Sequence, residues 1–184
     1  MKNKLIAGSV LLFCATVAIA QGESGAGQDD KETSRELRKA EKELRRSERT
    51  VSYQSNQAFM RDFPDAANVN WRVKGAFEEA TFDSKGVTLT AYYDAGSELV
   101  GTTTEKTFDD LPMKAQEHIK KFYSNYKPID VVMFDDNENN DTDMMLYNSL
   151  FDGEDNYFVA LKNNKETIIL KVNMDGDTAF FKTL

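Results

Sequence analysis

Residues 53–104 read YQSNQAFMRDFPDAANVNWRVKGAFEEATFDSKGVTLTAYYDAGSELVGTTT. The apolar residues before Pro64 recur at helical spacing, and Pro64 ends the helix because it disfavours the helical conformation at the preceding residue. Four short β-like runs follow at 68–73, 77–82, 87–93 and 99–104, with Gly, Asp and Ser between them. Separators this short join antiparallel neighbours. The stretch therefore predicts one helix followed by a four-stranded antiparallel sheet.

The same order of elements recurs in residues 108–184. Asp109 or Asp110 is expected to cap a second helix, and Pro112 fits its first turn. Four β-like runs follow, at 129–134, 157–161, 167–172 and 178–181. The main difference is an acidic insertion at 135–156, which contains a further β-like run at 144–151. The sequence thus predicts an α+β fold of two tandem repeats, 51–107 and 108–184, each a helix with a four-stranded antiparallel sheet.

The first 20 residues have the features of an export signal. Two lysines precede an apolar run that closes on Ala18-Ile19-Ala20, and polar Gln21 follows, which predicts a secretory signal peptide cleaved after Ala20. The run is short for a membrane span. Lipoprotein processing at Cys14, the only cysteine, is disfavoured because bulky Phe13 precedes it. We therefore expect an exported chain, periplasmic or secreted, with no membrane span and no disulfide after processing.

Residues 21–50 differ in composition from the rest of the chain. Residues 21–32 hold three glycines and no large apolar residue, which predicts a flexible tether. Residues 33–50 are helix formers crowded with charge, which predicts a solvated helical arm. A heptad series of Leu37, Leu44, Val51 and Ala58 leaves a coiled coil as the minor alternative, because the intervening positions are polar. The folded domain is expected to span 51–184.

The charge balance narrows the classes of partner. The chain carries 31 Asp and Glu against 23 Lys and Arg, a net charge of −8, and removal of the leader takes away two more lysines. An acidic chain is unsuited to nucleic acid and to anionic membrane surfaces. We therefore expect neither as a partner.

The residues give no basis for catalysis or for a cofactor. His118 is the single histidine, and no cysteine remains after export, so Cys/His chemistry and zinc sites lack their groups. Residues 135–143 read DDNENNDTD and resemble the opening of a calcium loop, but Asn140 replaces its glycine and Leu146 its closing glutamate. A solvated loop is favoured over a weak calcium site. We predict a non-enzymatic protein with no cofactor.

Three motifs carry a family resemblance. They are FPDAANVNW at 63–71, AYYDAGSEL at 91–99, and FDDLP at 108–112 before a helix. Together they resemble the PepSY-like family of small bacterial exported domains, also called β-lactamase-inhibitor-like, over about residues 51–184. The resemblance implies repeats that each lay a helix on an antiparallel four-stranded sheet, and it implies no enzyme activity. The family offers no common set of functional residues, and both the acidic insertion and the charged arm lie outside its pattern.

The two predicted sheets differ in how their faces are patterned. Residues 87–93 alternate between apolar and polar positions, typical of one buried and one wet face, whereas the strands of the second repeat are apolar on both faces. One helix covers only one face. A cover is therefore needed for a candidate partner-binding face made of Val132, Phe134, Phe158, Ile169 and Phe180.

Two interpretations of this face remain open. Either the insertion at 144–151 or the first repeat folds over it, or it stays open for a protein partner or a second copy of the chain. Acidic loops around an open face would favour a basic partner. The function expected is an exported binding domain, protein-binding or inhibitor-like. The alternatives are a small-ligand or weak calcium-binding module and a structural protein of the cell envelope.

Overall fold

The computed structural model describes residues 35, 37–39 and 50–184. The chain divides into two units, Met1–Glu41 and Lys42–Leu184. In the first unit, residues 35 and 37–39 are helical and exposed. The predicted signal peptide, with Ala18, Ala20 and Gln21 at its cleavage site, lies outside the described residues, as does the tether. All further description concerns residues 50–184, in which no helix is long and apolar enough to cross a membrane.

The first half of the domain has the predicted elements. They are α2 (Tyr53–Asp62), β1 (Ala67–Lys74), β2 (Phe77–Ser84), β3 (Val87–Tyr93) and β4 (Leu99–Lys106). The helix begins where Ser52 Oγ accepts a hydrogen bond from Ser55 N at 2.9 Å, an N-cap that satisfies one free amide of the first turn. It ends at Asp62, with Phe63 as its C-cap directly before Pro64.

The second half has its own helix and strands. They are η1 (Phe108–Asp110), α3 (Met113–Phe122), β5 (Lys127–Asp136), β6 (Met144–Leu146), β7 (Ser149–Phe151), β8 (Asn156–Lys162), β9 (Thr167–Asn173) and β10 (Thr178–Thr183). The prediction that Asp109 or Asp110 caps α3 is wrong. Asp110 Oδ2 accepts a hydrogen bond from Thr107 N at 2.7 Å and so caps the N-terminus of the short helix η1. The run at 144–151 is a hairpin and not one strand, since Tyr147 and Asn148 turn the chain with φ of 52° and 58°.

Eight strands from both halves form one large sheet, and β6 and β7 pair in a two-stranded sheet of their own. Its order is β1-β2-β3-β4-β5-β8-β9-β10, and every neighbouring pair is antiparallel. The halves join where β4 pairs with β5, from Gly101 opposite Asp136 to Lys106 opposite Val131. The expectation of a separate sheet in each half is therefore wrong. The fold is mainly a continuous eight-stranded antiparallel sheet with few helices.

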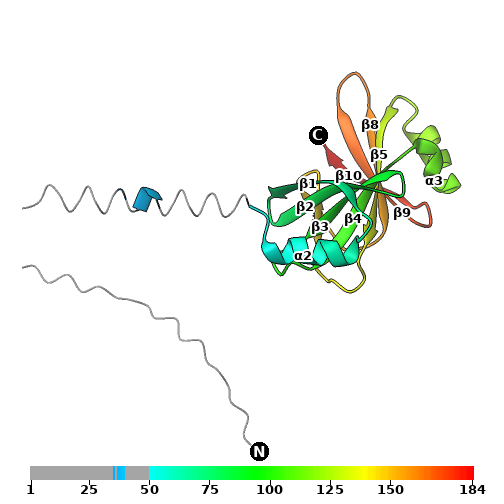
Figure 1. The fold of residues 1–184 in the computed structure, drawn as a ribbon. Helices are drawn as coiled ribbons and strands as arrows, with labels where there is room; N and C mark the ends of the chain where they lie inside the picture. The colour runs from blue at the N-terminus through cyan, green and yellow to red at the C-terminus, as the bar shows by residue number, and fades with distance from the viewer. Residues whose placement is uncertain (1–34, 36, 40–49) are drawn as a thin grey trace, which may run out of the picture. The chain divides into compact units, whose positions relative to one another are not determined.

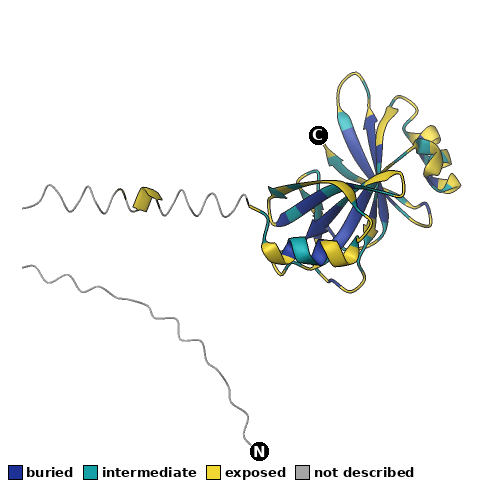
Figure 2. Cartoon of the chain, in the orientation of Figure 1, coloured by how far each residue is buried: buried dark blue, intermediate teal, exposed yellow. Residues whose placement is uncertain are grey.

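The sheet has a helix face and a hairpin face. The register carries Ala91 through Thr102 to Asp135, so the apolar clusters under α2 and under α3 lie on the same face, which we call the helix face. Figure 1 shows the two helices at separate places on the sheet. The hairpin β6–β7 packs with a third apolar cluster on the opposite face, the hairpin face. Figure 2 shows the buried residues concentrated in the strands between these layers.

Candidate binding surfaces

The hairpin covers most of the predicted partner-binding face. Phe134, Phe158 and Ile169 are each 0% exposed and belong to the cluster that packs with β6–β7. The ring of Phe151, on the hairpin, lies edge-on to Phe134 at 5.2 Å and to Phe158 at 4.8 Å between centroids. These three residues therefore lie in the core. Of the two interpretations drawn from the sequence, the structure shows cover by the insertion.

The other two residues of that face lie elsewhere. Val132 is on the hairpin face and half-buried. Phe180 stands opposite Leu170 and so lies on the helix face, and a bulge between Phe180 and Lys182 shifts the register of β10 only after it. Phe181 packs into the hairpin cluster instead, with its ring 5.1 Å from that of Phe158. The prediction that Phe180 shares a face with Phe158 is wrong, and Phe180 is 59% exposed.

The hairpin is fastened to the sheet at its tip and its base. Lys182 Nζ donates to the carbonyl oxygens of Tyr147 at 2.8 Å and Asn148 at 3.3 Å. Burial raises the pKa of the Tyr147 hydroxyl to about 12. At the base, Asn140 Nδ2 donates to Asp94 Oδ2 at 3.0 Å, and Asn137 Nδ2 donates to Leu99 O at 2.6 Å. The start of the insertion is thus tied to β4 and the turn before it, and is not the freely solvated loop expected from its charge.

Acidic residues gather at one end of β5 and β8. A cavity of about 400 Å³ lies there, and its lining includes Asp136, Glu138, Glu154, Asp155 and Asp175. Asp155 Oδ1 accepts a hydrogen bond from Asp136 N at 2.8 Å. Burial, and then the charge of Asp155, raise the pKa values of Asp135 and Asp136. Asp136 Oδ1 is buried beside Gly153 without a hydrogen-bond partner. The described residues hold no group of three or more His, Cys, Asp or Glu placed to bind a metal ion.

His118 lies among aromatic rings. Its ring is 4.6 Å from that of Phe122 and 6.3 Å from that of Tyr123, measured between centroids, and the residue is half-buried. These contacts favour a packing role for His118.

The first half of the hairpin face is polar and largely paired with itself. Glu79, only 4% exposed, forms an ion pair with Arg72 on the neighbouring strand. Thr81 and Thr90 hydroxyls lie 3.0 Å apart. Tyr92 and Thr103 hydroxyls are also 3.0 Å apart, and burial is the main cause that raises the pKa of Tyr92. This part of the sheet satisfies its polar groups across the strands.

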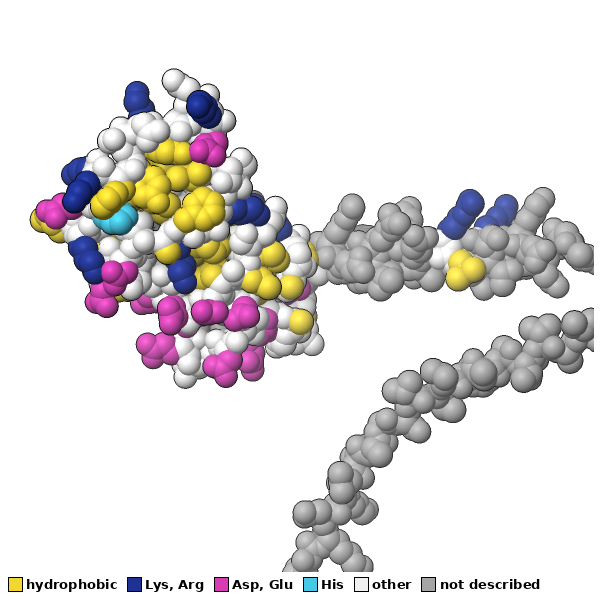
Figure 3. All heavy atoms as spheres, turned by 180° about the vertical axis from the view of Figure 1, so that it is seen from behind, with side chains coloured by type: hydrophobic (Ala, Val, Ile, Leu, Met, Phe, Trp, Pro, Cys, Tyr) yellow, Lys and Arg dark blue, Asp and Glu magenta, His cyan; other side chains and the backbone are white. Residues whose placement is uncertain are grey.

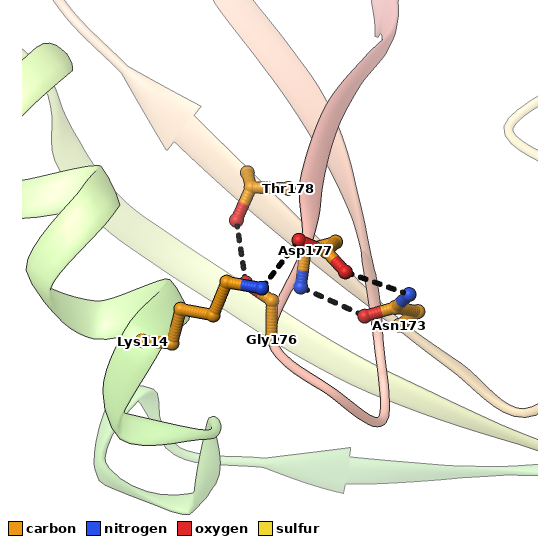
Figure 4. Close-up of polar contacts among 5 residues, drawn as sticks. All are labelled: Lys114, Asn173, Gly176, Asp177 and Thr178. Atoms are coloured by element: carbon orange, nitrogen blue, oxygen red, sulfur yellow. Dashed lines mark hydrogen bonds and ion pairs between the residues drawn. The ribbon is translucent and has the colours of Figure 1, made fainter.

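On the helix face, α3 is held to the β9–β10 turn by polar contacts (Figure 4). Lys114 Nζ lies 2.5 Å from Asp177 Oδ1, and Asp177 N donates to Asn173 Oδ1 at 2.7 Å. The hydrogen bond from Lys114 lowers the pKa of Asp177. Gly176 has φ +82°, and a side chain there would meet the backbone of Ala115 at 3.2 Å, so this turn requires glycine. The network fixes α3 close to the strand that carries Phe180.

A groove lined by lysines lies at the opposite end of β5 and β8 from the acids. It has a volume of about 640 Å³ and is lined by Asn125, Lys127, Ile129, Lys162, Asn163, Asn164 and Lys165. Lys127 and Lys162 are direct cross-strand partners. The sequence analysis did not identify this groove because its lysines come from two separate strands and a turn. The signal in the sequence was that Lys127 precedes the β-like run at 129–134, whereas Lys162 and Lys165 follow the run at 157–161.

Comparisons with known proteins give matches only to solved structures. No family model matches, and a search of curated proteins finds no significant match. A BLIP-like protein from Bacteroides fragilis is 20% identical with a TM-score of 0.57, over 73% of this chain and 87% of that one. A DUF2874 family protein from Bacteroides uniformis is 14% identical with a TM-score of 0.58, over 73% and 89%. A protein from Bacteroides eggerthii described as a candidate periplasmic protein is 14% identical with a TM-score of 0.58, over 73% and 88%.

These likenesses show that the chain has a BLIP-like fold. At identities of 14–20% they carry no residue roles across. Any function must be argued from the surfaces of this chain.

Proposed function

We propose that this chain is an exported, non-enzymatic binding domain and that its partner is a protein. The observation that supports this most directly is a pair of exposed aromatic side chains in the second half. Phe122, at the end of α3, is 62% exposed, and Phe180, on the edge strand β10, is 59% exposed. Exposed aromatic side chains are enriched where proteins bind one another.

Three features support the remaining parts of the proposal. The leader sequence favours export, in line with the candidate periplasmic description of the B. eggerthii protein. The packing of His118 against aromatic rings favours a protein without catalysis. The motif at 63–71 and the recurrence of a helix with four strands favour a PepSY-like domain of two tandem repeats.

The charges beside the exposed aromatics favour an acidic partner. Lys120 and Lys121 are exposed on α3, and Lys121 lies over the ring of Phe122. Figure 3 shows hydrophobic side chains gathered on one face of the domain, with lysines and arginines bordering them and most acids at the lower edge. Electrostatic complementarity then selects a partner that brings carboxylates to this surface. The sequence favoured a basic partner only for the face that the hairpin now covers.

Site-directed photocrosslinking in the producing cell tests the proposal. A photoreactive phenylalanine is placed at position 180 or 122, and at Val87 as the control, because Val87 is also exposed, at 46%, but lies in the first half. We expect one adduct of defined mass from positions 180 and 122 and none from position 87. An adduct of twice the chain mass would identify a second copy as the partner. Equal labelling at all three positions, or none at any, would refute the assignment of this surface.

A further inference from the structure

The lysine groove is unusual because its charges repel one another. Lys127 and Lys162 stand opposite each other on β5 and β8, and Lys165 lies in the turn that follows β8. Like charges in directly opposed positions destabilise a sheet. In the described residues, none of the three ammonium groups makes a hydrogen bond or an ion pair with a carboxylate. Three uncompensated cations therefore converge on one groove in a chain of net charge −8.

The acids nearest in sequence, Asp130 and Glu166, form no ion pair with these lysines in the part of the chain that the structure describes. The Oε1 of Glu166 instead accepts a hydrogen bond from the Tyr126 hydroxyl at 2.5 Å. The acids that line the other cavity lie at the far end of β5. A ten-residue strand places them about 30 Å away, well beyond the screening length of a physiological salt solution. The residues that line the groove include three lysines and no acid, so the lining carries a net positive charge.

The lining of the groove suits a small polar molecule that carries a phosphate. Lysine ammoniums bind phosphate as compact point charges. The volume of about 640 Å³ falls within the range of small-molecule sites and exceeds what a phosphate ion alone would fill. Asn125 and Asn164 supply amide groups for hydroxyls, and Ile129 supplies an apolar wall.

We propose that this groove binds a phosphate ester of a small polar molecule such as a sugar. Lys127 and Lys162 hold the phosphate between them, and binding relieves their mutual repulsion. Lys165 adds a third charge from the turn. Neither Phe122 nor Phe180 lines this groove, so the proposal is tested independently of the proposed protein partner.

Titration calorimetry on the chain purified after export tests the proposal. The probes are glucose 6-phosphate, glucose as the uncharged control, and vesicles of phosphatidylglycerol or phosphatidylcholine. The variant is Lys127→Gln with Lys162→Gln, and the matched control is Lys74→Gln with Lys85→Gln, two exposed lysines of the first half. Both double variants change the net charge equally.

We expect the wild type to bind glucose 6-phosphate at low salt and to bind glucose far more weakly. The groove variant should lose affinity about tenfold or more, and the control variant should stay within about twofold of the wild type. Binding to phosphatidylglycerol vesicles with the same dependence on the two lysines would identify a lipid headgroup as the source of the phosphate.

Three results would overturn the proposal. One is a wild type that binds neither glucose 6-phosphate at millimolar concentration nor anionic vesicles. Another is an equal loss in both double variants, which would reduce the effect to net charge. The third is that no phosphate probe binds, while the wild type self-associates at low salt and the groove variant does not. The groove would then hold the acidic end of a second copy of the chain.

Discussion

Gly101 lies where the two halves of the sheet join, and replacing it with alanine tests whether that junction is as tightly packed as the structure shows. A methyl group on Gly101 would come within 2.5 Å of Phe134 Cζ and 2.6 Å of the carbonyl oxygen of Asp135. Phe134 is 0% exposed, and the oxygen belongs to the backbone of β5, so neither atom moves freely. Overpacking of this kind costs about 1–3 kcal/mol, and the double clash places Gly101→Ala at the upper part of that range.

Thermal unfolding followed by circular dichroism measures the effect. At about 3–5 °C per kcal/mol for a domain of this size, we expect the melting temperature to fall by about 6–15 °C. Gly96→Ala is the control, because a methyl group there meets only the side chains of Asp94 and Glu98 in an exposed turn. Adding Phe134→Leu should recover part of the loss, since it removes the ring but not the backbone contact. If Gly101→Ala has the same melting temperature as Gly96→Ala, the close packing of β4 against β5 is refuted.

Three further results are expected. Phe158→Ala should lower the free energy of unfolding in urea by about 3–5 kcal/mol because its side chain is fully buried, whereas Phe180→Ala should change it by less than about 0.5 kcal/mol. Similar losses for both variants would contradict the assignment of Phe158 to the core and of Phe180 to the surface. The pKa of Asp136 is raised in the folded state, so its carboxyl favours folding at a pH below its unfolded pKa and disfavours folding once the pH rises through the folded pKa. Asp136→Asn should therefore raise the melting temperature more at pH 7 than at pH 4, unlike the exposed control Asp65→Asn. An equal change at both pH values would argue against the raised pKa. Ser52→Ala removes the cap of α2 and should cost about 1 kcal/mol, and a variant as stable as the wild type would show that the cap contributes nothing.

The elements were predictable because their signals are local. The turn residues between 82 and 87 and between 93 and 99 separate the strands that the structure contains there. Pro64 marks the end of α2 for a reason that depends on one neighbour only. By contrast, the pairing of Lys106 with Val131 brings together strands on either side of α3. Nothing in the local pattern distinguishes one sheet of eight strands from two of four.

The candidate site was predictable only in part, because a pattern shows which residues need cover and not what covers them. Apolar residues on both faces of the second half required a second layer, and the hairpin supplies it. The face of Phe180 was predicted wrongly because Phe180 and Phe181 are adjacent apolar residues, and only the pairing of Phe180 with Leu170 decides which of them shares a face with Phe158. The lysine groove depends on the pairing of two strands and was therefore not visible in the linear sequence.

The hairpin determines which surfaces of this fold remain for binding. It fills the second half of the hairpin face with its own aromatic and methionine side chains, and the first half of that face pairs its polar groups across the strands. Two other surfaces remain exposed. One has aromatic side chains at the end of α3 and on β10, and the other has three lysines near the start of β5 and the end of β8. One surface exposes apolar area bordered by lysines and the other exposes mainly charge, so added salt should weaken binding at the lysine groove more than binding at Phe180. That difference in salt dependence is the physical reason to treat them as two sites with different ligands.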